Sequence, residues 1–148
     1  MYKIYLDNCC YNRPFDNQSQ TKVHLEALAK LHIQEQIRRQ RYQLVWSYIL
    51  DYENGNNPYT DRRLAIAPWK SLATDVIANE NEDILSFAER LASGGIKNYD
   101  ALHIACAVYA RCDYFLTTDK KLLNSPVEQI KIVNPLIFLN EVEGDIDA

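Results

Sequence analysis

Four acidic residues stand at positions where folding could gather their carboxylates in one place. Asp7 and Asp119 each come directly after an apolar run, YKIYL and DYFLTT respectively. Asp100 opens a strongly apolar segment that precedes the second of these runs, and Glu53 follows shortly after the apolar run LVW. Clustered carboxylates repel one another, so they either take up protons or bind a cation. Oxygen ligands without a cysteine or a histidine pair favour Mg²⁺ or Mn²⁺ over zinc.

A divalent cation held by such carboxylates has a defined chemistry. It can hold a phosphodiester, lower the pKa of a bound water to make a nucleophile, and stabilise the leaving oxygen during in-line displacement. Three or four carboxylates suit this reaction. The candidate catalytic and metal-binding residues are therefore Asp7, Glu53, Asp100 and Asp119.

Each of these acids also has a purely structural interpretation. An aspartate directly after a strand, such as Asp7 or Asp119, is a common turn residue. Asp100 can serve a helix N-terminus by capping it or by interacting with the helix dipole. Glu53 is more informative, because an acid near a helix C-terminus is mildly disfavoured by the dipole. Asp51 lies two residues earlier, on the opposite helix face, and the pattern alone does not choose between them.

The elements that would position these acids are predicted from the period of the apolar residues. The predicted strands cover residues 2–6, 43–46, 114–117 and 130–133, with an edge strand at 75–78. The predicted helices cover residues 19–40, 47–53 with Ser47 as N-cap, 61–72 with a break at Pro68, 82–93, 99–110, 119–124 and 135–140. Residues 8–18 hold Pro14 and several asparagines, which predicts a loop.

Strands separated by helices indicate a mainly parallel sheet with helices on both faces, because parallel neighbours need crossover connections. We therefore expect an α/β fold of three layers. Ligands bind such open sheets beyond the carboxyl ends of the strands. Asp7 and Asp119 would project into the same crevice there, and Glu53 and Asp100 could join them.

The composition is that of one globular domain. The chain has 148 residues, of which 47% are hydrophobic and 24% charged, which is an ordinary balance. A chain of this length folds without a metal, so any metal would be functional. The first apolar run is too short for a signal peptide, and no apolar stretch is long enough to span a membrane. We therefore expect no membrane association. The four cysteines form no CxxC pair, so we expect them to be free, buried thiols in the reducing cytoplasm.

The net charge of −4 is unexpected for a protein that would act on a polyanion. Part of it comes from the last eight residues, which contain four acids, Glu141, Glu143, Asp145 and Asp147. Without them, 16 acidic residues stand against 16 basic ones, from totals of 20 and 16. Local basic patches remain possible on this neutral body, and so does ordinary solvated surface charge.

Five sequence pieces around these acids resemble a known family. They are LDNCC at the first strand end, SYILDYE with Ser47 six residues before Glu53, NYDALHIACAV, FLTTD, and IVNPLIFL near the C-terminus. Together they resemble the PIN-domain nucleases, and most of all the VapC-like ribonuclease toxins of bacterial toxin–antitoxin pairs. The pieces occur in family order and cover nearly the whole chain. Each is weak alone, but five in sequence are fairly specific.

The resemblance implies a PIN-like, Rossmann-like domain over residues 1–140, followed by an acidic tail over residues 141–148. It implies dependence on Mg²⁺ or Mn²⁺, single-stranded RNA as substrate, a cognate antitoxin protein as partner and a homodimer. It also implies which acids act: Asp7, Glu53, Asp100 and Asp119 match the family quartet, which leaves Asp51 outside. Thr117 matches the threonine of the family's TxD motif, and Asn8 is the polar neighbour of the first aspartate.

The sequence departs from the family after the last aspartate. Many members carry a further acid two residues later and then a phenylalanine, whereas this chain has Lys121 and Leu122. This difference argues against a strong second metal site. His103 lies three residues after Asp100 and could share its helix face, but an apolar helix more often holds a core histidine. The tyrosines could stack bases, and none is assigned to RNA.

Three functions remain open at this point. The first is a metal-dependent endoribonuclease, acting as the toxin of a toxin–antitoxin pair. The second is a catalytically degenerate PIN scaffold that binds RNA or a protein partner, which Lys121 favours. The third is another Mg²⁺-dependent aspartate domain, such as a phosphoryl-transfer hydrolase or a phospho-accepting receiver. The hydrolase pattern would need an acid at Cys9, and the receiver pattern would need an acidic pair where the chain has Asp7 and Asn8.

Overall fold

Five parallel strands form the sheet at the centre of the protein. In the computed structural model, which describes residues 1–144, the strands are β1 (Lys3–Leu6), β2 (Gln43–Ser47), β3 (Asp75–Ile77), β4 (Tyr114–Leu116) and β5 (Lys131–Val133). Their order across the sheet is β3-β2-β1-β4-β5, and every neighbouring pair is parallel. β1 is the central strand, where Ile4 pairs with both Leu44 and Tyr114. The segment predicted as an edge strand, β3, lies at an edge.

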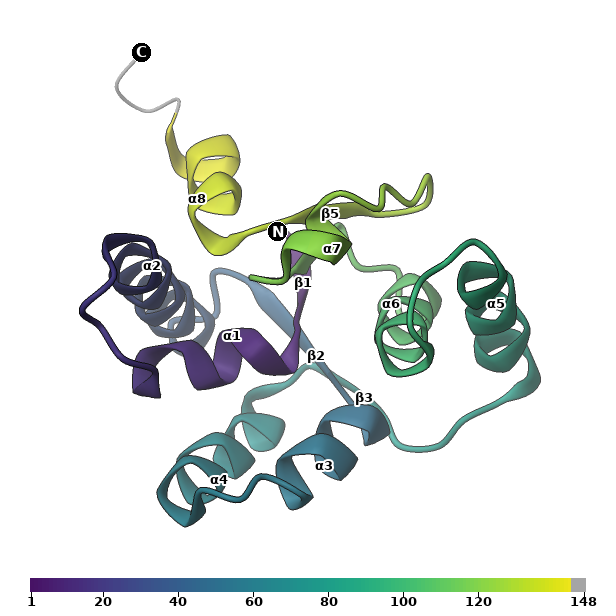
Figure 1. Ribbon diagram of the computed structural model, residues 1–148, viewed down its shortest axis with the longest axis horizontal. Helices are drawn as coiled ribbons and strands as arrows, with labels where there is room; N and C mark the ends of the chain where they lie inside the picture. The colour runs from purple at the N-terminus through teal and green to yellow at the C-terminus, as the bar shows by residue number, and fades with distance from the viewer. Residues whose placement is uncertain (145–148) are drawn as a thin grey trace.

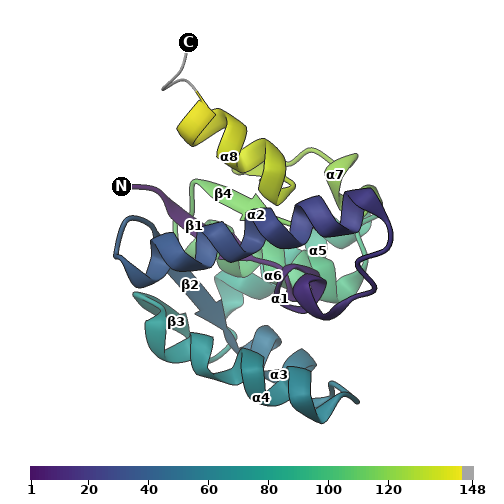
Figure 2. The ribbon, with the colours of Figure 1, turned by 90° about the vertical axis from the view of Figure 1, so that its left-hand side faces the viewer.

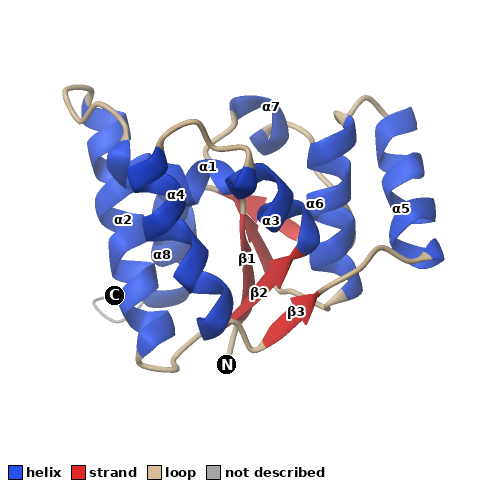
Figure 3. Cartoon of the chain, turned by 90° about the horizontal axis from the view of Figure 1, so that it is seen from below, coloured by secondary structure: helices blue, strands red, loops and turns tan. Residues whose placement is uncertain are grey.

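Helices cover both faces of this sheet (Figure 1). On one face α5 (Glu82–Ser93) packs against α6 (Asn98–Tyr109), and on the other α2 (Thr21–Arg38) packs against α8 (Pro135–Glu143). Figure 2 looks onto the second layer, with α2 in front, and Figure 3 shows the strands between the two layers. Ile4, Tyr5 and Leu6 are fully buried, because a parallel sheet covered on both faces hides its central strand. The α/β fold of three layers is confirmed.

Short helices follow the strands at the carboxyl edge of the sheet. α3 (Tyr48–Gly55) begins directly after β2, and the predicted N-cap is confirmed, since the Ser47 hydroxyl accepts a hydrogen bond of 3.3 Å from the backbone N–H of Leu50. α4 (Thr60–Ile66) gives way to the 3₁₀ helix η2 (Ala67–Leu72) at the predicted break, Pro68. α7 (Lys120–Leu123) follows β4. These helices place Glu53 and Asp119 at the same edge as the end of β1.

The segment after β1 is partly helical, where the sequence predicted a loop over residues 8–18. It contains α1 (Asn8–Asn12) and the 3₁₀ helix η1 (Arg13–Phe15). The side chain of Asp7 caps α1, and Pro14 occupies the first turn of η1, where no backbone N–H is needed. Tyr11 is fully buried and anchors α1 to the core. The loop prediction was wrong here because aspartate, asparagine and proline also begin helices.

The last described helix extends beyond its predicted end. α8 runs to Glu143, whereas the sequence predicted residues 135–140. Glu141 accepts a hydrogen bond of 2.8 Å from the Tyr114 hydroxyl, and Glu143 is bonded to the Tyr42 hydroxyl and, at 2.9 Å, to Nε2 of His32. These two acids therefore belong to a packed helix. Residues 145–148, with the other two acids of the predicted tail, lie outside the described residues.

The sequence also predicted that no segment spans a membrane and that the cysteines are free, buried thiols. Within residues 1–144, no helix combines the length and apolarity that crossing a membrane requires. The four cysteines are free thiols, and Cys10, Cys106 and Cys112 are buried. Burial raises the pKa of the Cys106 thiol to about 12, which keeps it protonated and unreactive.

Candidate metal centre

Asp7 lies at the carboxyl end of the central strand, and its carboxylate is held from two sides. Oδ1 accepts a hydrogen bond of 2.8 Å from the backbone N–H of Asn8, because Asp7 caps α1. Oδ2 accepts a hydrogen bond of 2.9 Å from the hydroxyl of Thr117, which follows β4. The Asp7 backbone N–H donates to the carbonyl of Leu116 at 2.9 Å. With only 6% of the residue exposed, this carboxylate is fixed in one orientation.

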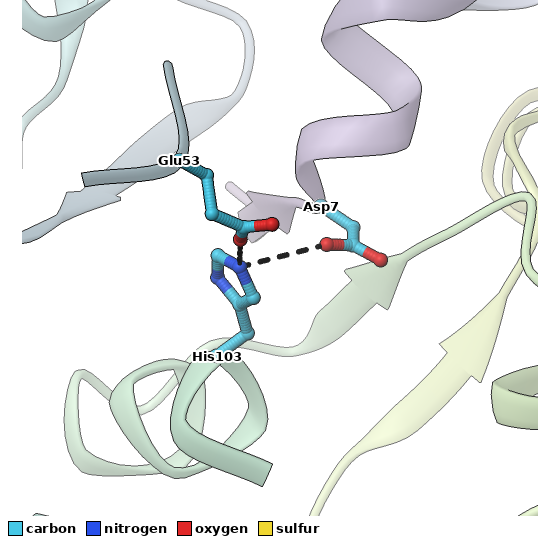
Figure 4. A group of neighbouring side chains, drawn as sticks. All are labelled: Asp7, Glu53 and His103. Atoms are coloured by element: carbon cyan, nitrogen blue, oxygen red, sulfur yellow. Dashed lines mark hydrogen bonds and ion pairs between the residues drawn. The ribbon is translucent and has the colours of Figure 1, made fainter. Parts of the chain in front are cut away.

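A histidine meets two of the acids at this edge (Figure 4). Glu53 extends from α3 and His103 from α6, and Oε1 of Glu53 is hydrogen-bonded to Nε2 of His103. The same Nε2 lies 3.8 Å from Oδ1 of Asp7. One ligand atom from each of these three residues lies within 4.8 Å of the other two, and among residues 1–144 this is the one group with such spacing. Two carboxylates and an imidazole can together hold a divalent ion.

Behind His103, a chain of hydrogen bonds leads into the core. Its Nδ1 lies 2.6 Å from the Tyr5 hydroxyl, which lies 2.6 Å from the Ser47 hydroxyl. An ionised carboxylate accepts hydrogen bonds and cannot donate them, so the bond to Glu53 requires a proton on Nε2. His103 is therefore a donor that orients the Glu53 carboxylate. Hydrogen-bonded partners of metal ligands commonly act in this way.

The charge around His103 supports this protonation. Burial lowers the pKa of the imidazole, but the hydrogen bond that His103 donates to Glu53 and the negative charges of Asp7, Glu53 and Asp100 raise it by more. The net pKa lies above the usual value for histidine. The side chain is 1% exposed, so water contributes little screening.

Asp100 lies in the first turn of α6 and senses the other acids. Burial is the largest cause that raises the pKa of its carboxyl to about 6, followed by the negative charges of Asp7 and Asp119, with a further contribution from Glu53. His103 opposes this shift. The four acids thus share one electrostatic environment, although the oxygens of Asp100 and Asp119 are outside the 4.8 Å group.

Asp119 is joined to Asp7 through a shared threonine. Its backbone N–H donates to the Thr117 hydroxyl at 3.1 Å, and that hydroxyl donates in turn to Asp7. The Asp119 carboxylate caps α7, where Oδ1 accepts a hydrogen bond of 2.8 Å from the backbone N–H of Lys121. Oδ2 has no hydrogen bond within the part of the chain that the structure describes. One oxygen of Asp119 is therefore occupied structurally, and the other is free to bind a ligand.

The predicted site residues differ in how closely the fold brings them together. Asp7 and Glu53 both lie close to Nε2 of His103, so these three residues form one group. Asp100 and Asp119 lie outside this group but close enough for their charges to interact with it. Asp51 lies apart, since it accepts hydrogen bonds from Nε1 of Trp46 and from Lys70. Asp51 and Glu53 point away from each other because residues two positions apart lie on opposite faces of a helix. The catalytic role of the four acids stays a prediction.

Sequence reasoning gave His103 too little weight. The interpretation as a core histidine was correct for its burial, but its Nε2 points at two carboxylates. The available signal was its place three residues after Asp100 on α6. Asn8, predicted as a supporting residue, contributes its backbone N–H to Asp7, and its side-chain Oδ1 is buried without a hydrogen-bond partner.

The donor set fits a hard divalent cation. The acids supply oxygens, and their mutual repulsion adds to the effect of burial in raising the pKa of Asp100. No cysteine belongs to the group of potential ligands, although Cys9 Sγ donates a weak hydrogen bond to Oδ2 of Asp7 at 3.5 Å. Carboxylates with at most one imidazole suit Mg²⁺ or Mn²⁺.

Comparison with known proteins bears on the fold. No family model matches this chain, and no curated protein sequence matches it. The chain is similar to one in the crystal structure of VapBC2 from Rickettsia felis bound to a DNA fragment from their promoter. The two align with a TM-score of 0.52 and 15% identity, over 89% of this chain and 98% of that one. At this identity the similarity concerns the fold alone, and it agrees with the PIN-like α/β class that the sequence predicted.

Proposed function

We propose that this protein is a metal-dependent endoribonuclease that cleaves phosphodiester bonds of single-stranded RNA as the toxin of a toxin–antitoxin pair. The observation that carries the proposal is the convergence of Asp7 and Glu53 at the carboxyl edge of a parallel sheet, within the charge field of Asp100 and Asp119. Ligands of open α/β sheets bind at this edge. The order of the five sequence pieces and the VapBC2-like fold support the same conclusion.

The residues divide the work between binding and orientation. Asp7, Glu53, Asp100 and Asp119 would hold Mg²⁺ or Mn²⁺, with Asp7 fixed by Thr117 and Glu53 oriented by the Nε2–H of His103. A bound divalent ion supplies a polarised phosphate and an activated water. Because Asp7 and His103 are nearly buried, bulk water cannot weaken these contacts, and their geometry is set before substrate arrives.

A basic cavity beside the acids supports a polyanionic substrate. A cavity of about 330 Å³ is lined by Asp100 and by three lysines, Lys97, Lys120 and Lys121. Lysines attract phosphates through charge, independently of base sequence. The lysine at position 121, which departs from the family pattern, thus lies where the RNA backbone would enter the site.

The partner proposals rest on the comparisons. The similar chain belongs to a VapBC2 complex bound to promoter DNA, so we propose a cognate antitoxin protein for this chain as well. The resemblance to VapC-like toxins also implies a homodimer in the bacterial cytoplasm. Co-expression with the gene immediately upstream, followed by affinity purification and light scattering, tests both: a stable complex and a dimeric mass are expected.

A second candidate is a catalytically degenerate scaffold that binds RNA or a protein. One observation favours it: Oδ1 of Asp119 is engaged in capping α7 through the N–H of Lys121. If Asp119 serves only the helix, the site loses one ligand. Calorimetry separates the two functions, because a scaffold without a metal centre would take up no Mn²⁺ at millimolar concentration.

The deciding experiment compares two acids of the same helix. Purified protein is incubated with single-stranded RNA and Mg²⁺ or Mn²⁺, alongside the variants Asp7→Asn, Glu53→Gln and Asp51→Asn. The first two should lose at least about a hundredfold in cleavage rate, since a metal centre contributes several kcal/mol to such a reaction. Asp51→Asn should cleave like the wild type, because Asp51 contacts Trp46 and Lys70 instead. Cleavage that persists in Asp7→Asn or in excess chelator would refute the proposal.

A further inference from the structure

A groove adjoins the metal centre on the side of Glu53. This groove, which we call the tyrosine groove, encloses about 430 Å³, and its lining includes Asn8, Tyr52, Asn56, Tyr59, Arg62 and Tyr99. This volume lies within the ~300–1,000 Å³ of typical ligand pockets. Glu53 itself lines the groove, so whatever occupies it lies next to the candidate metal ligands.

Three tyrosine rings of the groove are exposed to solvent. Tyr52 is 54%, Tyr59 60% and Tyr99 50% exposed. Tyr52 of α3 and Tyr99 of α6 are stacked, with ring centroids 5.6 Å apart and an angle of 23° between the rings. In a stacked pair each ring covers part of one face of the other, and the outer faces remain available for a further flat ring to stack on. The stacked pair joins α3 and α6, the two helices that also carry Glu53 and His103.

The third ring, that of Tyr59, is held in place by Arg62, whose guanidinium is already paired with an aspartate. The guanidinium of Arg62 lies 4.6 Å from the centre of the Tyr59 ring. Its Nη1 donates to Asp16 at 3.0 Å and its Nη2 to the carbonyl of Phe15 at 2.8 Å. Arg62 therefore fixes Tyr59 and offers little net charge to a ligand. A phosphate would find no unpaired cation in this groove, whereas the lysine cavity on the side of Asp100 holds three lysines.

The remaining polar groups of the groove are amides. The Asn56 side chain donates through Nδ2 to the carbonyl of Tyr52 at 3.0 Å, and its Oδ1 makes no hydrogen bond with any described residue. Oδ1 of Asn8 is buried and also without a partner. Side-chain amides match the donors and acceptors on the edges of nucleobases. Exposed aromatic faces with neutral amides suit a base better than a phosphate.

We propose that the tyrosine groove binds a nucleobase of single-stranded RNA adjacent to the phosphate at the metal centre, with the base stacked on an outer face of the Tyr52–Tyr99 pair or on Tyr59. This inference rests on the proposed function, and it goes beyond it by naming the groove that would orient the RNA substrate. The base occupies the groove next to Glu53, and the backbone continues towards the lysine cavity beside Asp100. Unpaired bases are recognised in this manner, by stacking on aromatic side chains.

The test measures binding separately from cleavage. The protein is titrated with a fluorescein-labelled single-stranded oligoribonucleotide in Ca²⁺, and gel analysis verifies that the oligonucleotide stays intact. Tyr52→Ala combined with Tyr99→Ala should weaken binding by about tenfold or more, the usual effect of losing a stacked base. The corresponding Phe variants keep the rings and should bind like the wild type. Mn²⁺ affinity should be unchanged in all of them.

A matched control lies on the same helix. Tyr109, at the other end of α6, is 49% exposed and lines no part of the groove, so Tyr109→Ala should bind RNA like the wild type. An oligonucleotide with 5-iodouridine next to the cleaved bond should photo-crosslink to Tyr52, Tyr59 or Tyr99, as mass spectrometry of the peptides would show.

The outcomes separate this inference from the proposed function. If the wild type cleaves RNA while the double Ala variant binds equally well, or if the crosslink falls on Tyr109, the groove does not hold a base and the nuclease function stands. If the wild type neither binds nor cleaves RNA, the proposed function itself fails. If the groove variants lose a co-purified protein partner but keep RNA affinity, the groove is a protein-binding surface and the inference is overturned.

Discussion

The hydroxyl of Thr117 donates a hydrogen bond of 2.9 Å to Oδ2 of Asp7, and this contact joins the end of β4 to the end of β1. The same hydroxyl accepts from the backbone N–H of Asp119 at 3.1 Å. Thr117 is fully buried, so no water competes for these bonds. One side chain thus sets the distance between two acids that are far apart in the sequence.

Replacing Thr117 should therefore weaken both metal binding and the fold. Thr117→Val keeps the shape of the side chain and removes the hydroxyl, and we expect Mn²⁺ affinity to fall by about tenfold to a hundredfold. The free energy of unfolding should fall by about 1–3 kcal/mol, because buried polar atoms lose their partner. Isothermal titration calorimetry and urea unfolding measure the two effects. Thr117→Ser, which restores the hydroxyl, should recover most of the affinity; a Ser variant as weak as Val would contradict this explanation.

His103 is expected to orient Glu53 without binding the metal. His103→Ala should lower Mn²⁺ affinity by about tenfold, since Glu53 loses its donor. Tyr5→Phe, which removes the hydroxyl that contacts Nδ1 of His103 and the Ser47 hydroxyl but leaves the imidazole in place, should have a smaller effect in the same direction. Pulsed electron paramagnetic resonance of the wild type with Mn²⁺ should show no strong nitrogen coupling. A strong coupling that disappears in His103→Ala would make His103 a ligand.

Asp100 should destabilise the protein when no metal is bound. Its pKa is raised from 3.8 to about 6, first by burial and then by the charges of Asp7 and Asp119. The folded state then binds more protons than the unfolded state between these two values, so stability falls as the pH rises through that window. Above it, Asp100→Asn should be more stable than the wild type by about 1 kcal/mol in chelator, after allowance for solvent screening. Thermal unfolding near neutral pH measures this difference.

The metal-bound protein supplies the complementary measurement. With saturating Mn²⁺ the advantage of Asp100→Asn should shrink or reverse, because the wild-type carboxylate then interacts with a cation. Equal stability of the two proteins in chelator would show that Asp100 does not experience the repulsion described here.

Lys30 gives a second pH dependence, away from the metal centre. This lysine on α2 is 2% exposed and lies over the rings of Tyr11 and Trp69 at 5.1 and 5.7 Å. Burial lowers its pKa from 10.5 to about 7. The unfolded state binds the proton more tightly, so stability contributed by this group rises with pH between these values. From about pH 7 to about pH 9 the gain should reach about 2 kcal/mol.

The variant Lys30→Met isolates this contribution. It keeps the apolar stem and removes the charge, so it should be more stable than the wild type near neutral pH, with a difference that shrinks as the pH rises. Urea unfolding of both proteins across this pH range provides the measurement. The buried thiols Cys106 and Cys112, whose ionisation at high pH would destabilise the fold, do not interact with Lys30, so their contribution is the same in both proteins and cancels. A difference that is constant with pH would mean that Lys30 does not lose its proton in the folded state.

Much of the fold follows from local sequence patterns. The period of apolar residues predicts both ends of α5 and the last residue of β5, which begins one residue later than predicted, and Ser47 is the predicted cap of α3. These features depend on neighbours within a few residues, which the sequence displays directly. The helix α1 was missed because Asn8 and Pro14 fit a turn as well as a helix start. The buried Tyr11 that stabilises this helix gains its contacts only in the folded core.

The sequence by itself determined which acids follow which strands, because strand ends and their turn residues are local features. It also determined that their carboxylates would face one edge, since parallel strands share a direction. Only the tertiary structure decided that Glu53 meets His103 and that Tyr52 stacks on Tyr99. Both contacts bridge α3 and α6, which are separated along the chain by α4, η2, β3 and α5. How closely two such distant helices approach depends on how their side chains pack against each other in the folded protein.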